Sequence, residues 1–134
     1  MLFKRPLIEA GTVMPAKMRA GDGFLGNPIV TEKTTNADHT ITVAEMSTGV
    51  LYYSALSAGR AVTTPTAALI LAAAPDMDIG DSFCFLVSIQ DAFAITWAAG
   101  TDVTLAGRAT TPASSSTWIV VTKTSATTVT WFVA

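Results

Sequence analysis

Residues 63–107 read TTPTAALILAAAPDMDIGDSFCFLVSIQDAFAITWAAGTDVTLAG, and their middle part, residues 81–90, carries the clearest strand pattern in the chain. Side chains on a strand point alternately to opposite faces. One face is fully apolar, with Phe83, Phe85, Val87 and Ile89. The other also carries Cys84 and Leu86 between polar ends. A strand that is apolar on both sides is either central in a sandwich or covered on one side by another subunit.

A short helix is predicted just before this strand. Residues 66–74, TAALILAAA, are rich in the strong helix formers Ala and Leu. Thr66 is a suitable N-cap, and Pro75 ends the run. The following DMDIGD, residues 76–81, is typical of a turn in which Gly80 takes a positive φ angle.

The rest of the chain predicts further strands separated by turn signals. They are residues 40–45, 50–55, 60–64, 94–98, 102–106, 117–123 and 128–133. Two hairpins are expected, one joining 94–98 to 102–106 through Gly100 and one closing the chain through residues 125–127. About eight strands, rich in Thr and Val, predict an all-β fold. The simplest arrangement is a jelly-roll-like β-sandwich with one short helix.

Residues 1–39 are predicted to form an extended N-terminal arm, and residues 40–134 the sandwich body. Prolines at 6, 15 and 28 and glycines at 11, 21, 23 and 26 interrupt the first segment. It is nevertheless richer in apolar side chains than disordered tails are. We therefore expect the arm to become ordered against its own body, a sister subunit or a larger shell.

The composition of the 134 residues is poor in charge. Only 13% of residues are charged and half are apolar, whereas ordinary soluble chains carry roughly 25% charged residues. This predicts a surface covered largely by partners, although a monomeric β-protein with a Ser/Thr-rich surface is the alternative. The net charge of −2 does not favour nucleic-acid binding. The start of the chain lacks a signal-peptide core, and no run is long enough to span a membrane.

The sequence offers no convincing catalytic set, metal site or cofactor motif. The single histidine, His39, is predicted to be exposed at the arm–body junction, and the single cysteine, Cys84, to be a buried, inert thiol. The aspartates of the DMDIGD segment are interpreted as turn residues rather than calcium ligands. The glycine-rich GDGFLG at residues 21–26 lacks the context of a phosphate loop. Trp97, Trp118 and Trp131 lie in strand patterns, which favours core positions over sugar stacking.

The order of elements from residue 41 to residue 134 resembles β-rich virion proteins of tailed bacteriophages. The pattern is a short Ala/Leu helix after a Thr-Pro turn, a Gly-Asp-Ser-Phe strand start, TWAAGTDVTLAG, a Ser/Thr-rich segment and the strand WIVVTKT. It is similar to the β-domain of head decoration (cement) proteins and of related fibre or knob domains.

This resemblance implies a non-enzymatic virion protein, made in the host cytoplasm, that binds the outer surface of the phage head as a homotrimer. Its partner is then the major capsid protein, and it needs no cofactor, nucleic acid or membrane. The basic arm suits an acidic protein surface, although a solvated tail is the alternative. The arm residues expected to bind the capsid are Leu2, Phe3, Lys4, Arg5, Leu7, Ile8, Lys17, Arg19, Phe24 and Leu25. The alternative is a tail fibre or knob that binds a host-surface glycan.

Overall fold

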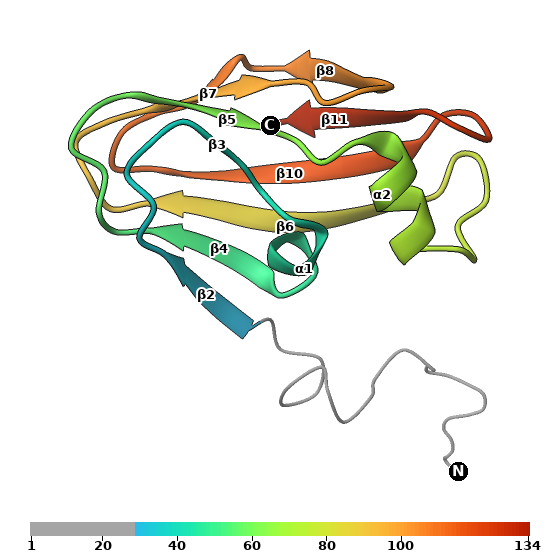
Figure 1. The fold of residues 1–134 in the computed structure, drawn as a ribbon, viewed down its shortest axis with the longest axis horizontal. Coiled ribbons are helices and arrows are strands. Elements are labelled where there is room, and N and C mark those ends of the chain that lie inside the picture. Colours follow the sequence, from blue (N-terminus) through green and yellow to red (C-terminus); the bar gives the residue numbers. More distant parts are fainter. Residues whose placement is uncertain (1–28) are drawn as a thin grey trace, which may run out of the picture.

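The computed structural model describes residues 29–134, which form two stacked β-sheets (Figure 1). The larger sheet has six strands, in the order β2 (Ile29–Lys33), β4 (Gly49–Tyr53), β6 (Ser82–Ile89), β10 (Ser116–Lys123), β11 (Val129–Val133) and β8 (Val103–Gly107). The smaller sheet has four, in the order β3 (His39–Thr40), β5 (Arg60–Thr63), β7 (Ile95–Ala98) and β9 (Thr110–Thr111). Two short helices, α1 (Val43–Met46) and α2 (Ala67–Ala73), lie at one end of the sandwich (Figure 1). The all-β prediction is confirmed.

The predicted jelly-roll connectivity is not confirmed. β6 pairs antiparallel with β10, β10 with β11, and β7 with β9. The other pairs, β2–β4, β4–β6, β11–β8, β3–β5 and β5–β7, are parallel. Parallel neighbours need long crossover connections, whereas antiparallel neighbours can be joined by tight turns. The chain therefore crosses repeatedly between the sheets, and α2 lies in the crossover from β5 to β6.

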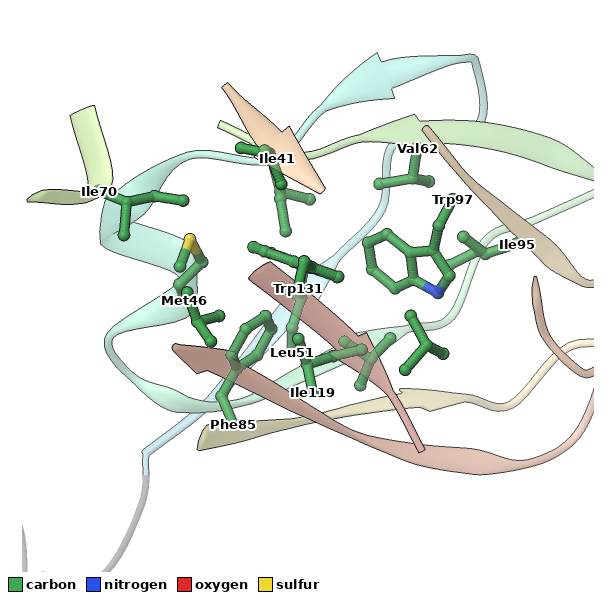
Figure 2. Close-up of a cluster of buried hydrophobic side chains, with 14 of the residues drawn as sticks. Ile41, Met46, Leu51, Val62, Ile70, Phe85, Ile95, Trp97, Ile119 and Trp131 are labelled. Atoms are coloured by element: carbon green, nitrogen blue, oxygen red, sulfur yellow. The ribbon is translucent and has the colours of Figure 1, made fainter. Parts of the chain in front are cut away.

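The core is formed where the inner faces of the two sheets meet. Trp131 of β11 is fully buried and contacts Phe85 of β6 edge-on, with ring centroids 5.5 Å apart. Trp97 of the smaller sheet lies 5.6 Å from the Trp131 ring and so links the two sheets (Figure 2). The Trp97 indole N–H donates to Thr111 Oγ1 at 3.0 Å, which satisfies its buried polar atom. Large aromatic rings thus fill the space that the strands enclose.

Several local predictions are confirmed. The helix at residues 66–74 is α2, capped by Thr66, whose side chain accepts from the Leu69 amide. The strand at residues 81–90 is β6, and it lies between β4 and β10 in the larger sheet. The closing hairpin is β10 paired with β11.

The predicted strand at residues 40–45 is wrong beyond Thr40, because residues 43–46 form α1. Thr42 and Glu45 make a capping box at its start. The Glu45 amide donates to Thr42 Oγ1 at 3.2 Å, and the Thr42 amide donates to Glu45 Oε1 at 2.9 Å. These reciprocal hydrogen bonds satisfy two amides that the first turn of a helix leaves free. The capping signal, Thr-x-x-Glu, therefore overrides the alternating pattern of TITVAE.

The predicted hairpin between residues 94–98 and 102–106 is also wrong. These strands are β7 and β8, and they belong to different sheets. Gly100 does not form a hairpin turn; its amide donates to Thr64 Oγ1 at 2.9 Å. A Cβ atom at Gly100 would lie 2.7 Å from the Thr64 carbonyl oxygen. The glycine lets the chain pass close to the end of β5 before it crosses to the larger sheet.

β2 belongs to the segment predicted as an arm. Its five residues pair in parallel with β4 and form one edge of the larger sheet. Residues 1–28, the remainder of the predicted arm before β2, lie outside the described part of the chain. No helix of residues 29–134 is long and apolar enough to cross a membrane.

Gly107 and Gly80 provide a matched test of how closely β8 and β11 approach. Both have positive φ angles, 84° at Gly107 and 97° at Gly80. A Cβ atom at Gly107 would lie 2.3 Å from the Val133 carbonyl oxygen, whereas one at Gly80 meets nothing within 4 Å. Gly107→Ala is expected to lower the free energy of unfolding by about 3 kcal/mol, and Gly80→Ala by about 1–2 kcal/mol. Urea unfolding measures the free energy of unfolding of both variants. Equal losses in the two variants would contradict the close approach of β8 to β11.

Candidate functional site

The outer face of the larger sheet carries an apolar band two rows wide. The first row runs across neighbouring strands through Val30, Val50, Leu86 and Trp118. The second row runs through Cys84, Val120, Phe132 and Ala106. We call these eight residues the outer apolar band. Their neighbours along each strand point inward, because side chains alternate between faces.

The band is open to solvent in the described part of the chain. Val30 is 62% exposed, Trp118 53% and Phe132 42%, while Cys84 is also exposed. Isolated apolar residues on a surface are normal, but contiguous patches mark interaction sites. The outer apolar band spans five strands, from β2 to β11, and reaches Ala106 on the sixth, β8. It is the most extended apolar feature on this face.

Polar rows border the band on both sides. One consists of Glu32, Tyr52, Ser88 and Ser116. The other consists of Ser82, Thr122, Thr130 and Thr104. Cross-strand hydroxyl pairs hold them together: Ser116 Oγ donates to Ser88 Oγ at 2.9 Å, and the Ser82 and Thr122 hydroxyls lie 2.6 Å apart. An apolar centre with a polar rim is the arrangement found in protein–protein interfaces, and Glu32 is the one charged residue of these two rows.

Two predictions about this face are wrong. Cys84 is exposed rather than buried, and Trp118 is on the surface rather than in the core. Both residues lie on the outer side of the β6–β10 pair, whose inner side holds the core. The core prediction is confirmed for Trp97 and Trp131, which are 4% and 0% exposed. Alternation assigns side chains to two faces, and the packing of the second sheet decides which face is buried.

His39 is half-buried rather than exposed, and it bridges two strands. Its Nδ1 lies 2.8 Å from the Ala37 carbonyl oxygen, and its Nε2 lies 2.7 Å from the Tyr53 hydroxyl. Because a carbonyl can only accept, Nδ1 carries the proton, and Nε2 accepts from Tyr53. Burial, together with the nearby Glu45 carboxylate, raises the pKa of Tyr53 well above its ordinary value, so the hydroxyl remains a donor. This arrangement fixes β3 against β4 and leaves no free imidazole nitrogen for catalysis.

Glu45 and Lys33 form an ion pair at the end of β2, with Nζ 2.6 Å from Oε2. Burial raises the pKa of Glu45, but hydrogen bonds from Lys33 and Thr42 lower it more, and the net pKa is below 4.5. The ion pair connects the edge strand β2 to the capping box of α1. It is a structural contact rather than part of a reactive site.

The aspartates at the turn before β6 make the contacts of a turn, as interpreted from the sequence. The Asp78 amide donates to Asp81 Oδ2 at 2.9 Å, and the Asp81 amide donates to the Asp78 carbonyl at 3.0 Å. Within residues 29–134, no group of three or more His, Cys, Asp or Glu side chains could hold a metal ion.

An apolar hollow of about 260 Å³ lies between the two helices and the start of β6. Its lining includes Val43 and Met46 of α1, Ile70 of α2 and Phe83 of β6. The hollow could not be predicted from a sequence pattern in which residues 40–45 indicate a strand rather than α1. The capping box at Thr42 was the signal that could have revealed it.

All ten residues predicted to bind a capsid lie between Leu2 and Leu25, outside the described residues, as does the GDGFLG segment. The structure therefore brings together a different set, the outer apolar band. The signal for it was present in the sequence as the second apolar face of residues 81–90. Comparisons of the chain with protein-family models, curated proteins and solved structures returned no match.

The Lys33–Glu45 ion pair predicts a pH dependence of stability. The pKa of Glu45 is lowered on folding, so its contribution is present above pH 4.5 and is lost as the pH falls through the folded-state value. Glu45→Gln is expected to lower the free energy of unfolding by roughly 1 kcal/mol at neutral pH. The difference from the wild type should shrink below pH 4.5.

Urea unfolding across this pH range measures the effect, with the exposed Asp76→Asn as the control for loss of one negative charge. A difference between wild type and Glu45→Gln that stays constant with pH would contradict the role of the ionised carboxylate.

Proposed function

We propose that this protein acts by adhesion, as a structural virion protein of a tailed bacteriophage that decorates the head. The observation that carries the proposal is the outer apolar band with its hydroxyl-rich rim, which has the chemistry of a protein-contact surface. The resemblance of residues 41–134 to head decoration proteins supplies the class of assembly. The proposal keeps the two-sheet sandwich and does not depend on jelly-roll connectivity.

The low charge of the chain supports an adhesive role. Only 13% of residues are charged, and the sixteen positions of the band and its two polar rows include one charged side chain, Glu32. Removing such a face from water costs little, because few ions must lose their hydration. Burial of its apolar atoms then contributes free energy in proportion to the area covered.

The N-terminal segment is attached beside this face. Residue 28 leads directly into β2, and Val30 of β2 belongs to the outer apolar band. The segment holds four basic side chains within residues 1–20, against one acidic residue, Glu9. In our proposal, it binds the major capsid protein through these charges and its apolar residues. Several linked contacts raise the overall affinity without one strong site.

The proposed location is the outer surface of the expanded head, where the protein stabilises junctions between capsomers. The resemblance implies three copies in a homotrimer at these junctions. The role is mechanical, and the proposal assigns no reaction and no cofactor.

Deletion of residues 1–20 tests the proposed role of the arm. The truncated protein is expected to bind emptied, expanded heads of the phage that carries its gene at least about tenfold more weakly, because one set of linked contacts is lost. Co-sedimentation measures the bound fraction. A variant with Lys4, Arg5, Lys17 and Arg19 changed to Gln separates the charge contribution from the apolar one.

Equal binding by the full chain and the truncated protein would contradict this role. The truncated protein must retain the circular dichroism and melting temperature of the full chain for the comparison to count.

The exposed Trp118 favours a second candidate, a tail fibre or knob that binds a host-surface glycan. Its ring is 53% exposed and neighbours the hydroxyl row of Ser88 and Ser116. An open aromatic face next to hydroxyl groups suits stacking on a sugar ring. Glycan-array binding that is lost in Trp118→Ala but kept in Leu69→Ala, an exposed residue of α2, would support this candidate over head decoration.

A further inference from the structure

We propose that the outer apolar band binds the same band of a second copy of this chain through a two-fold axis parallel to the strands. This inference goes beyond the proposed function, since it concerns how the protein assembles with itself. It depends on residues 29–134 alone, and it leaves the contact with the head to the N-terminal segment.

The apolar and polar rows on this face run across the strands, and this arrangement suits self-association. The outer apolar band lies in the middle, and a hydroxyl-rich row lies on each side of it. A two-fold interface places one patch against the same patch of its partner. With the axis parallel to the strands, each row meets the same row of the other copy, and at the centre of the contact Leu86 meets Trp118 and Cys84 meets Val120.

The strand order suits the same axis. The sheet runs β2-β4-β6-β10-β11-β8, so its centre lies between β6 and β10. Rotation about an axis at this centre reverses the order, and β6 of one copy then faces β10 of the other. Leu86 of each copy lies opposite Trp118 of the other. The largest exposed ring in the band thus meets an aliphatic side chain rather than another indole.

The charges at the two edges of the sheet are complementary under this rotation. Glu32 lies on β2, at one edge, and is exposed. Arg108 directly follows β8, at the opposite edge, and its Nε donates to the Ala134 carbonyl at 3.2 Å. β2 and β8 lie at opposite edges of the sheet (Figure 1). Reversing the strand order therefore places the β2 edge of one copy over the β8 edge of the other. Glu32 then lies near Arg108 of the second copy, and the contact occurs twice.

These edge charges fix orientation more than they add affinity. Exposed ion pairs contribute little to stability, while complementary charges select the register of an interface and exclude others. In an arrangement that keeps the strand order, Glu32 would lie over the β2 edge of the other copy and Arg108 over its β8 edge, so the two opposite charges would stay apart. The charge pattern therefore favours the reversed order.

Two-fold symmetry also sets the number of chains. The isolated full-length protein should contain two chains, or six if three such pairs are joined by the trimer contact that the resemblance implies. Size-exclusion chromatography with light scattering measures this directly. A mass of one or three chains would overturn the face-to-face contact, and three chains would leave the proposed decoration trimer intact.

Trp118→Glu tests the band itself. A carboxylate opposite Leu86 of the second copy is expected to weaken the pairing at least about tenfold and to halve the mass at low concentration. Ile79→Glu is the matched control, because Ile79 is 65% exposed but lies in the turn before β6, away from the band. It should leave the mass unchanged. Circular dichroism confirms that both variants fold.

The charge swap tests the orientation without changing the band. Glu32→Arg and Arg108→Glu should each weaken the pairing, and the double variant should restore it to the wild-type level. Full-strength pairing in both single variants, or no rescue in the double variant, would overturn the proposed axis.

A monomer in which Cys84 does not react with a thiol reagent would also overturn the inference. It would show that residues 1–28 of the same chain cover the face.

Discussion

The antiparallel register between β6 and β10 is the constraint on which the rest of the structure depends. It places Phe85 beside Ile119 on the inner side and Leu86 beside Trp118 on the outer side. Because side chains alternate with a period of two, a shift of one residue would exchange the two faces of a strand. The same register therefore creates both the core and the outer apolar band. Burial of Phe85 and Ile119, which are 1% and 0% exposed, favours this register over the alternative.

The outer surface of the sandwich is unusual because burial alone does not explain its sequence. The inner face satisfies the hydrophobic requirement of folding with Trp131, Phe85 and their neighbours. Leu86, Val120 and Phe132 on the outer face contribute little to that core, and serine or threonine would be equally compatible with a strand. Apolar residues there fit the contact with a second copy that we propose.

The elements that depend on local signals could be predicted from the sequence. The helix after Thr66, the strand at residues 81–90 and the closing hairpin all follow from spacing, capping and turn residues. α1 was missed because a four-residue helix gives no periodicity, and only the Thr42–Glu45 capping box reveals it. The separation of β7 from β8 could not be predicted. It depends on the parallel pairing of β7 with β5, which joins segments far apart in the chain.

The candidate site, the outer apolar band, could also be predicted only in part from the sequence. The sequence reveals that residues 81–90 are apolar on both faces, and it offers two explanations, a central strand or a face covered by another subunit. The structure confirms the first, because β6 is central in its sheet, and its second face carries Cys84 and Leu86 of the outer apolar band. Coverage of that face by another subunit stays a prediction. Which strands would extend the band could not be inferred. Trp118, Phe132 and Val30 come from three separate segments, and only the sheet order brings them together.

The central claim is that a second copy covers this face, and the reactivity of Cys84 tests it most directly. Cys84 is the chain's one cysteine and lies within the band, so a bulky thiol reagent reports on that face alone. The account predicts slow labelling of the native protein at high concentration and fast labelling after dilution, as the copies separate. It predicts fast labelling of Trp118→Glu at every concentration. Fast labelling of the native protein that does not change with concentration would contradict the account.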